Sequence, residues 1–209
     1  MRAAVLRERP THVSRPPADS DREPHGSADG LPSSLVSDLR TDHAGETGAV
    51  LIYRGILAVT RDAAVRRFAL RHLATERRHL MAIEALLAPS QRSGLLPLWR
   101  IAGWLTGALP ALVGARAVYA TITTVETFVD QHYGEQIESI ERLDPGRLDP
   151  SLQALRAFLA SCRADEICHR DEAIERFGGV GERPSPLLRL WLRAVDRGSR
   201  AAVKVCRWV

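Results

Sequence analysis

The amino-acid sequence predicts an all-α protein. Of its 209 residues, 45% are hydrophobic and 26% are charged, which is a normal globular balance. The frequent residues Leu, Ala, Arg and Glu favour helices. Runs of β-branched residues with the period-two alternation of half-buried strands are missing. A chain of this length can bury one sizeable core, so we expect a single helical domain.

The first part of the chain differs from the rest. Residues 1–32 contain five prolines, mixed charges and almost no apolar periodicity. They predict a disordered or loosely attached N-terminal tail, followed by the helical domain over residues 33–209. The first helix is expected over about residues 35–60, with Ser33 or Ser34 as its N-terminal cap. The second fits about residues 62–88 and stops at Pro89.

An apolar segment occupies the middle of the sequence. Residues 94–114 include Pro97, Pro110 and four glycines, which predict a short, interrupted hydrophobic helix followed by a turn. Residues 101–115 carry no charge, but this run is too short to span a bilayer and is broken by a proline. Tryptophans beside the run suit a membrane interface instead. We therefore expect an extra interfacial helix here.

Three more helices follow from turn signals. A long helix fits about residues 111–143 and ends before the Asp-Pro-Gly sequence at 144–146. The next opens at residues 149–151, with Pro in its first turn, and runs to about residue 177. The last begins near Pro186 and continues toward the end of the sequence.

The last predicted helix is amphipathic. Its basic residues recur every three or four positions and form one stripe: Arg189, Arg193, Arg197, Arg200, Lys204 and Arg207. A basic amphipathic helix with tryptophans is typical of binding to an anionic membrane surface. Packing on the bundle with a solvated basic face is the alternative. Nucleic-acid binding is disfavoured, because aromatic residues do not interleave with the basic stripe.

The three cysteines, Cys162, Cys168 and Cys206, are too few and too far apart for a disulfide framework or a zinc site. They predict reduced thiols in a cytoplasmic protein. The N-terminus also lacks the apolar core of a signal peptide.

Two Glu-x-x-His motifs carry the chemistry. Glu76 and His79 form the first, and Glu166 and His169 form the second. Residues three apart share one face of a helix, so each motif can aim a carboxylate and an imidazole at one point. One such motif occurs often by chance, but here each lies within a separate predicted helix.

A pseudo-repeat strengthens this interpretation. Glu46 lies 30 residues before Glu76, and Glu126 lies 40 residues before Glu166, so each half of the chain supplies a lone Glu and then a Glu-x-x-His motif. Ferritin-like di-iron and di-manganese carboxylate bundles use this set of ligands. We therefore predict a ferritin-like four-helix bundle with the extra interfacial helix and the C-terminal amphipathic helix.

The predicted site is a di-iron centre. Four ionised carboxylates cancel the charge of two divalent cations, and imidazole suits iron. Glu76 and Glu166 are the expected bridging ligands between metals about 3.5–4 Å apart, and Glu46 and Glu126 the terminal ones. As alternatives, Glu76 beside two arginines could lie on a solvated helix face, and Glu126 could pair with Arg116.

Other polar residues lie on the same faces. Tyr53 and Tyr133 each follow a lone Glu by seven residues, which places them two turns away. Asp42 and Asp165 are candidates to accept a hydrogen bond from a ligating His. Core tyrosines and surface acids are the alternatives. His43 and His72 lie on or near ligand faces, but neither is predicted as a ligand.

Several motifs resemble the demethoxyubiquinone hydroxylases. The resemblance covers roughly residues 36–208 and rests on the sequence Arg-Thr-Asp-His-Ala-Gly-Glu at residues 40–46, on Ile52-Tyr53 with Gly55, on Glu76-x-x-His79, on Pro97-Leu98-Trp99, on Val125-Glu126 with His132-Tyr133, and on Asp165-Glu166-x-x-His169. The chain departs from the family pattern where Arg170 replaces a second histidine after His169, and where Asp130 replaces a small residue.

The resemblance implies a membrane-associated di-iron mono-oxygenase of ubiquinone biosynthesis. Such enzymes hydroxylate the ring of a polyprenyl benzoquinol with dioxygen as co-substrate. The resemblance implies two iron ions per chain, bound by the six residues of the two motifs and the two lone glutamates. From their place on the ligand faces we also expect catalytic roles for Tyr53, His132 and Tyr133, with a relay of protons or electrons through the last two.

The same features define the expected partners. These are the quinol, an electron donor such as NADH or a reductase, and a membrane surface, which the protein would bind peripherally on the cytoplasmic face. The sequence is also compatible with a homo-oligomer. A ferritin-like iron-storage or peroxide-detoxifying protein is the alternative, because it would use the same ligands without an organic substrate. A membrane scaffold with a structural metal is a third interpretation.

Overall fold

The computed structural model describes residue 28 and residues 30–178 and 184–209. In this part of the chain the regular structure is helical: α1 (Ser33–Val59), α2 (Ala63–Leu86), the short 3-10 helix η1 (Pro89–Gln91), α3 (Leu96–Val113), α4 (Ala115–Leu143), α5 (Pro150–Phe177) and α6 (Pro186–Cys206). The predicted all-α class is confirmed. Most of the predicted tail lies outside the described residues, but Ala28 is buried and its N–H donates to the Leu86 carbonyl.

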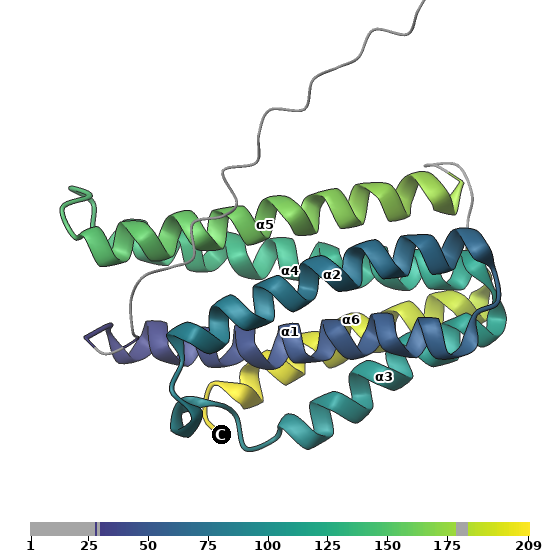
Figure 1. Ribbon diagram of the computed structural model, residues 1–209, viewed down its shortest axis with the longest axis horizontal. Helices are drawn as coiled ribbons and strands as arrows, with labels where there is room; N and C mark the ends of the chain where they lie inside the picture. The colour runs from purple at the N-terminus through teal and green to yellow at the C-terminus, as the bar shows by residue number, and fades with distance from the viewer. Residues whose placement is uncertain (1–27, 29, 179–183) are drawn as a thin grey trace, which may run out of the picture.

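Four long helices form the bundle. α1, α2, α4 and α5 run along the length of the molecule, with α1 packed on α2 and α4 on α5 (Figure 1). α3 packs along α1 and also contacts α4, while α6 contacts α4 and α1. The predicted ferritin-like four-helix bundle with two additional helices is therefore the observed architecture.

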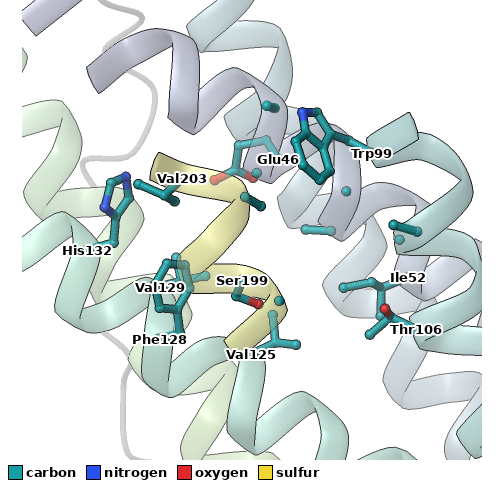
Figure 2. Close-up of a pocket in the computed structure, with 18 of the residues that line it drawn as sticks. Glu46, Ile52, Trp99, Thr106, Val125, Phe128, Val129, His132, Ser199 and Val203 are labelled. Carbon is teal, nitrogen blue, oxygen red and sulfur yellow. The ribbon is translucent and has the colours of Figure 1, made fainter. Parts of the chain in front are cut away.

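The two additional helices cover one side of the bundle and leave a cavity. It is bounded by α1, α3, α4 and α6, and has a volume of about 360 Å³ (Figure 2). Ser199 and Val203 of α6 lie between residues of α4, such as Phe128, and residues of α3, such as Trp99. α3 and α6 thus form the outer walls of a space whose inner wall belongs to the bundle.

The helix ends follow the sequence closely, with two exceptions. Asp62 and Asp149 cap α2 and α5, each accepting two backbone N–H groups of the first turn. The predicted serine cap of α1 is wrong, because Ser33 already lies in the helix and Pro32 occupies the cap position without a side-chain hydrogen bond. The Pro32 carbonyl instead accepts from Leu35 and Val36.

The predicted interruption near Pro110 is also wrong. α3 continues through Pro110 to Val113, and α4 begins at Ala115 instead of residue 111. Proline removes one helical hydrogen bond, but Pro110 is buried and α3 is held against α1 by close packing. The turn falls at Gly114, whose φ of 131° lies in a region that L side chains rarely adopt.

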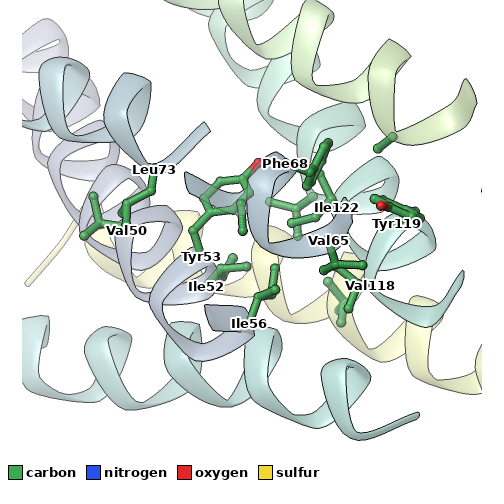
Figure 3. Packing of buried hydrophobic residues seen from close by; sticks show 14 residues of the cluster. Val50, Ile52, Tyr53, Ile56, Val65, Phe68, Leu73, Val118, Tyr119 and Ile122 are labelled. Carbon is green, nitrogen blue, oxygen red and sulfur yellow. The ribbon is translucent and has the colours of Figure 1, made fainter. Parts of the chain in front are cut away.

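The apolar core has two parts. One cluster lies around Tyr53, Phe68 and Ile122, and Figure 3 shows these side chains gathered between the helices. The other lies around Leu39, Ile140 and Leu159, toward the opposite ends of the same helices. In all four bundle helices the predicted ligand residues come between the positions that feed the two clusters. The metal-ligand candidates therefore lie in the middle of the bundle.

Glycines allow α3 to approach α1 closely. A Cβ at Gly107 would lie 1.9 Å from the carbonyl oxygen of Ile52. We expect Gly107→Ala to lower the free energy of unfolding by about 2–3 kcal/mol or more, because backbone must move to make room. Leu109→Ala is the control, since its side chain is 43% exposed on the same helix, and it should change stability by less than about 1 kcal/mol. Equal urea midpoints for both variants would contradict this packing.

Candidate metal centre

The six predicted ligand residues converge at the middle of the bundle. They are Glu46 on α1, Glu76 and His79 on α2, Glu126 on α4, and Glu166 and His169 on α5. Each of these residues is buried, with no more than 6% of its surface exposed. Glu76 is 1% exposed, so the alternative of a solvated helix face is contradicted. Four carboxylates and two imidazoles share a space that water barely reaches.

The six residues form two overlapping groups of four. Glu46, Glu76, His79 and Glu166 make one group, and Glu76, Glu126, Glu166 and His169 make the other. Within each group the candidate ligand atoms all lie within 4.8 Å of one another. The shared members, Glu76 and Glu166, are the two predicted as bridging residues. This arrangement could hold two metal ions side by side.

Several of the converging atoms have no hydrogen-bond partner. His79 Nδ1 lies 3.0 Å from Glu166 Oε1, and His169 Nδ1 lies 3.0 Å from Glu76 Oε1. These distances are short enough for ion pairs, yet all four atoms lack a partner with hydrogen-bond geometry, as does Glu46 Oε2. A buried polar atom without a partner destabilises a protein. The donor set therefore fits metal ions.

Burial opposes ionisation of the carboxyl groups and raises the pKa of three of the four. Burial raises the pKa of Glu46 to about 7, although His79 opposes the shift. Burial and the neighbouring Glu166 also raise the pKa of Glu76 and Glu126 well above the usual range. Burial opposes ionisation of Glu166 as well, but contacts with His169 and His79 outweigh it and lower its pKa to about 2. Cations or protons are needed to neutralise the group.

Two tyrosines cross the bundle to hold the lone glutamates. The hydroxyl of Tyr53 on α1 donates to Glu126 Oε1 on α4 at 3.0 Å, and that of Tyr133 on α4 donates to Glu46 Oε1 on α1 at 2.6 Å. Each tyrosine thus fixes the glutamate of the other half of the pseudo-repeat. Their position near the site followed from helical spacing, but the exchange of partners did not.

A carboxylate orients one histidine. His79 Nε2 lies 3.1 Å from Asp165 Oδ2, as predicted for Asp165. Because Nε2 faces Asp165, the other ring nitrogen, Nδ1, faces Glu46 and Glu166. Burial lowers the pKa of His79, but Asp165 and Glu166 outweigh it and raise the pKa to about 11 in the absence of a metal.

His72, for which the sequence predicts no role, borders the second histidine, His169. Its ring centroid lies 4.0 Å from that of His169 in an edge-to-face arrangement. His72 Nε2 lies 2.9 Å from Glu172 Oε2, and Glu172 also pairs with Arg71 and Arg176. On α5, Glu172 lies three residues after His169. This spacing was the sequence signal that could have placed Glu172, the partner of His72, beside the site.

Asp42 has a different partner from the one predicted. Its Oδ1 lies 3.1 Å from His132 Nε2 and accepts a hydrogen bond from Gln136 at 2.7 Å. Thr41 Oγ1 also lies 3.1 Å from His132 Nε2. Burial lowers the pKa of His132, but the Asp42 contact outweighs it and raises the pKa. Asp42 therefore fixes His132, which lines the cavity, and not a candidate ligand.

The two departures from the family pattern contact each other. Arg170 Nη1 on α5 lies 2.6 Å from Asp130 Oδ2 on α4, and Arg163 Nε lies 2.7 Å from Asp130 Oδ1. Asp130 lies one helical turn after Glu126, and Arg170 one turn after Glu166. The pair joins α4 to α5 beside the centre without taking part in it.

The cavity reaches the candidate metal centre. Glu46, Glu76, Glu126 and Glu166 are among the residues that line it, and most of the remaining lining is apolar or small. In Figure 2, Glu46 lies at one edge of the space, near Trp99, and Val125 and Val129 of α4 face it. A mainly apolar molecule that enters between α3 and α6 would therefore meet the carboxylates.

The outer walls of the cavity are exposed and apolar. α3 exposes Leu112 (71%) and Val113 (79%), and α6 exposes Leu190 (62%). Among the described helices, α3 is the one long and apolar enough to cross a membrane, judged by length and composition alone, and 22% of it is buried. In the structure it lies along α1 (Figure 1).

Comparison with known proteins gives a consistent result. Residues 33–206 match the family described as ubiquinone biosynthesis protein COQ7. A 3-demethoxyubiquinol 3-hydroxylase of Rhodospirillum rubrum is 35% identical over 198 residues, which cover 93% of this chain and 86% of that protein. The NADPH-dependent 3-demethoxyubiquinone 3-hydroxylases, mitochondrial, of Mus musculus and Caenorhabditis elegans are 30% and 31% identical, covering 79% and 80% of this chain and 73% and 86% of theirs.

The raised pKa of Glu46 predicts how the stability of the metal-free protein depends on pH. Between pH 4.5 and about 7 the folded state binds more protons at Glu46 than the unfolded state, so the stabilisation falls as pH rises. We expect the unfolding free energy of the wild type, relative to Glu46→Gln, to fall by roughly 1–3 kcal/mol over this range. Urea denaturation in chelator measures it. A difference that is constant with pH would refute the assignment.

Proposed function

The chain belongs to the ubiquinone biosynthesis protein COQ7 family, and we propose that it is a mono-oxygenase that hydroxylates the ring of a polyprenyl demethoxyubiquinol with dioxygen. The observation that supports this most directly is a pair of four-residue groups sharing Glu76 and Glu166, open to a mainly apolar cavity. The relatives are named as 3-hydroxylases, so we propose ring position 3 as the site of the new hydroxyl.

We assign two iron ions to the centre. Glu46, Glu76, His79 and Glu166 would hold one ion, and Glu76, Glu126, Glu166 and His169 the other, so Glu76 and Glu166 would serve both. When bound, such a pair of ions supplies the redox chemistry that activates dioxygen. Imidazole and carboxylate ligands suit iron, and four carboxylates neutralise two divalent ions.

The protein's own residues prepare the site. Tyr53 and Tyr133 hold the outer carboxylates in place from across the bundle, and Asp165 fixes the ring of His79. His132, held by Asp42, presents a protonatable group at the cavity wall. The apolar walls exclude water from a ring bound beside the carboxylates. Tyr53, His132 and Tyr133 thus remain our proposed catalytic residues.

The reaction requires a reductant. Conversion of an aromatic C–H to C–OH with dioxygen consumes two electrons and two protons and releases one water. The mammalian and nematode relatives are named as NADPH-dependent, so we propose a reduced nicotinamide nucleotide as the source, acting directly or through a reductase.

We also propose that the protein binds the cytoplasmic face of a membrane peripherally, through α3 and the basic α6. A prenyl-tailed quinol stays in the bilayer, and both helices that would face the membrane line the cavity. The exposed apolar residues of α3 and arginines such as Arg193 and Arg197 of α6 suit an interface with anionic lipid. An iron-storage role is less well supported, because storage does not require an apolar cavity that ends at the metal centre.

The activity is tested with reconstituted protein. We expect wild type with about two irons per chain to convert demethoxyubiquinone to its hydroxylated product, given a nicotinamide reductant and oxygen. Glu166→Ala removes a ligand shared by both metals, so bound iron should be lost and turnover should fall at least about 100-fold. Glu175→Ala, an exposed glutamate on the same helix, is the control. A Glu166→Ala protein that keeps two irons would refute the ligand assignment, and an iron-loaded wild type without turnover would refute the activity.

Membrane binding is tested by flotation with liposomes. We expect the wild type to float with vesicles that contain acidic lipid, and the double variant Leu112→Glu, Val113→Glu to stay behind, because charges on α3 oppose insertion of its apolar face. Leu148→Glu is the control, as Leu148 is 86% exposed in the loop between α4 and α5. If the wild type remains in the soluble fraction with and without acidic lipid, the protein does not bind membranes in this way.

A further inference from the structure

The glycines of α1, α3 and α6 are of two kinds. At Gly55, Gly103 and Gly107 a Cβ would lie 2.2, 2.5 and 1.9 Å from a backbone oxygen of the facing helix. These glycines are explained by the close approach of α1 and α3.

Gly45, Gly48 and Gly198 are not explained in that way. A Cβ built on any of them meets nothing within 4 Å, and none has the positive φ that favours glycine. The backbone of Gly48 contacts Gly103, but its own Cβ position is open. All three lie inside α1 or α6, where glycine is less stable than alanine because it loses more backbone freedom on folding. Helix stability therefore favours alanine at each position.

All three glycines line the cavity. On α1 they continue a face that runs from Thr41 to Ile52 at helical spacing, so the missing side chains would point into the cavity. On α6, Gly198 lies four residues from both Ala194 and Ala202, which also line it. The two helices contribute opposite walls, and both walls lack side-chain volume at these positions.

An unpaired polar atom indicates that this space receives a ligand. Asp42 Oδ2 is buried and has no hydrogen-bond partner, and Asp42 lines the same cavity. Asp42 is 4% exposed, and its other oxygen is already held by His132 and Gln136. A ligand for this space combines an apolar body with polar groups at the end that reaches the carboxylates.

We propose that Gly45, Gly48 and Gly198 are specificity-determining residues that keep the cavity wide enough for a flat, substituted six-membered ring. The identity of that ring as a demethoxyubiquinol rests on the proposed function. A methyl group on either wall narrows the passage, so the ring binds less well although the empty protein becomes more stable. Stability and ligand affinity change in opposite directions, which a merely structural glycine would not produce.

The test uses iron-loaded full-length protein with the single variants Gly45→Ala, Gly48→Ala and Gly198→Ala. Without ligand, we expect each variant to melt about 2–3 °C higher than wild type. We expect the dissociation constant for a demethoxyubiquinone with a short prenyl tail, and the KM in turnover, to rise about tenfold, with iron content unchanged. Ser161→Ala is the matched control: it adds helix propensity on the exposed face of α5, so it should raise the melting temperature slightly and leave affinity unchanged.

The proposal would be overturned if the three glycine variants bound the quinone as tightly as the wild type does. It would also be overturned if Ser161→Ala lost as much affinity as the glycine variants. A variant that melts lower than wild type would show that its Cβ position is not open, which also overturns the proposal there. Gly198→Ala decides if Gly45→Ala fails to fold, because Gly198 lies on α6, which supplies no candidate ligand. Binding is measured separately from turnover, so a wild type that binds the quinone without hydroxylating it refutes the proposed activity but not this inference.

Discussion

The structure depends on four carboxylates buried together in the middle of a helical bundle. Burial and mutual repulsion hold the pKa of Glu46, Glu76 and Glu126 above their usual range, and the six converging side chains leave several polar atoms unpaired. Two apolar clusters, one on each side along the bundle axis, keep this polar layer from water. Four ionised carboxylates in this space are unfavourable, so cations or protons are needed to neutralise them. The core, the crossing tyrosines and Asp165 are all consistent with the task of holding those charges at fixed positions.

Much of this centre could be predicted from sequence, because its signals are local. The two Glu-x-x-His motifs depend only on the i, i+3 geometry of a helix, and the pseudo-repeat supplies Glu46 and Glu126 at matching places. The helix boundaries followed largely from turn signals, such as Asp144-Pro145-Gly146 after α4 and Pro150 in the first turn of α5. What could not be predicted depends on packing between helices. Spacing placed Tyr53 and Tyr133 near the site, but only the crossing of α1 and α4 gives each the glutamate of the other half. Similarly, α3 continues through Pro110 because contacts with α1 outweigh a lost hydrogen bond.

Pairing across helices also explains the two departures from the family pattern. Considered singly, Asp130 and Arg170 each place a charge where the family has a different residue. In the structure they neutralise each other between α4 and α5, with Arg163 as a third member. The half-buried aspartate is compatible with the fold only because arginines accompany it. The two positions are 40 residues apart in the sequence, so no local pattern links them. Their contact in the structure shows that the two charges pair with each other and not with a candidate ligand.

The glycines show the same separation between sequence and structure. Gly48 on α1 and Gly103 on α3 touch each other, yet the first leaves an open Cβ position and the second has none. The sequence presents both simply as glycines in helices. A glycine that weakens its own helix, and whose open Cβ position no neighbour fills, lowers the stability of the empty protein. In our proposal a bound ligand occupies this space. The buried carboxylates and the cavity walls are then parts of one site.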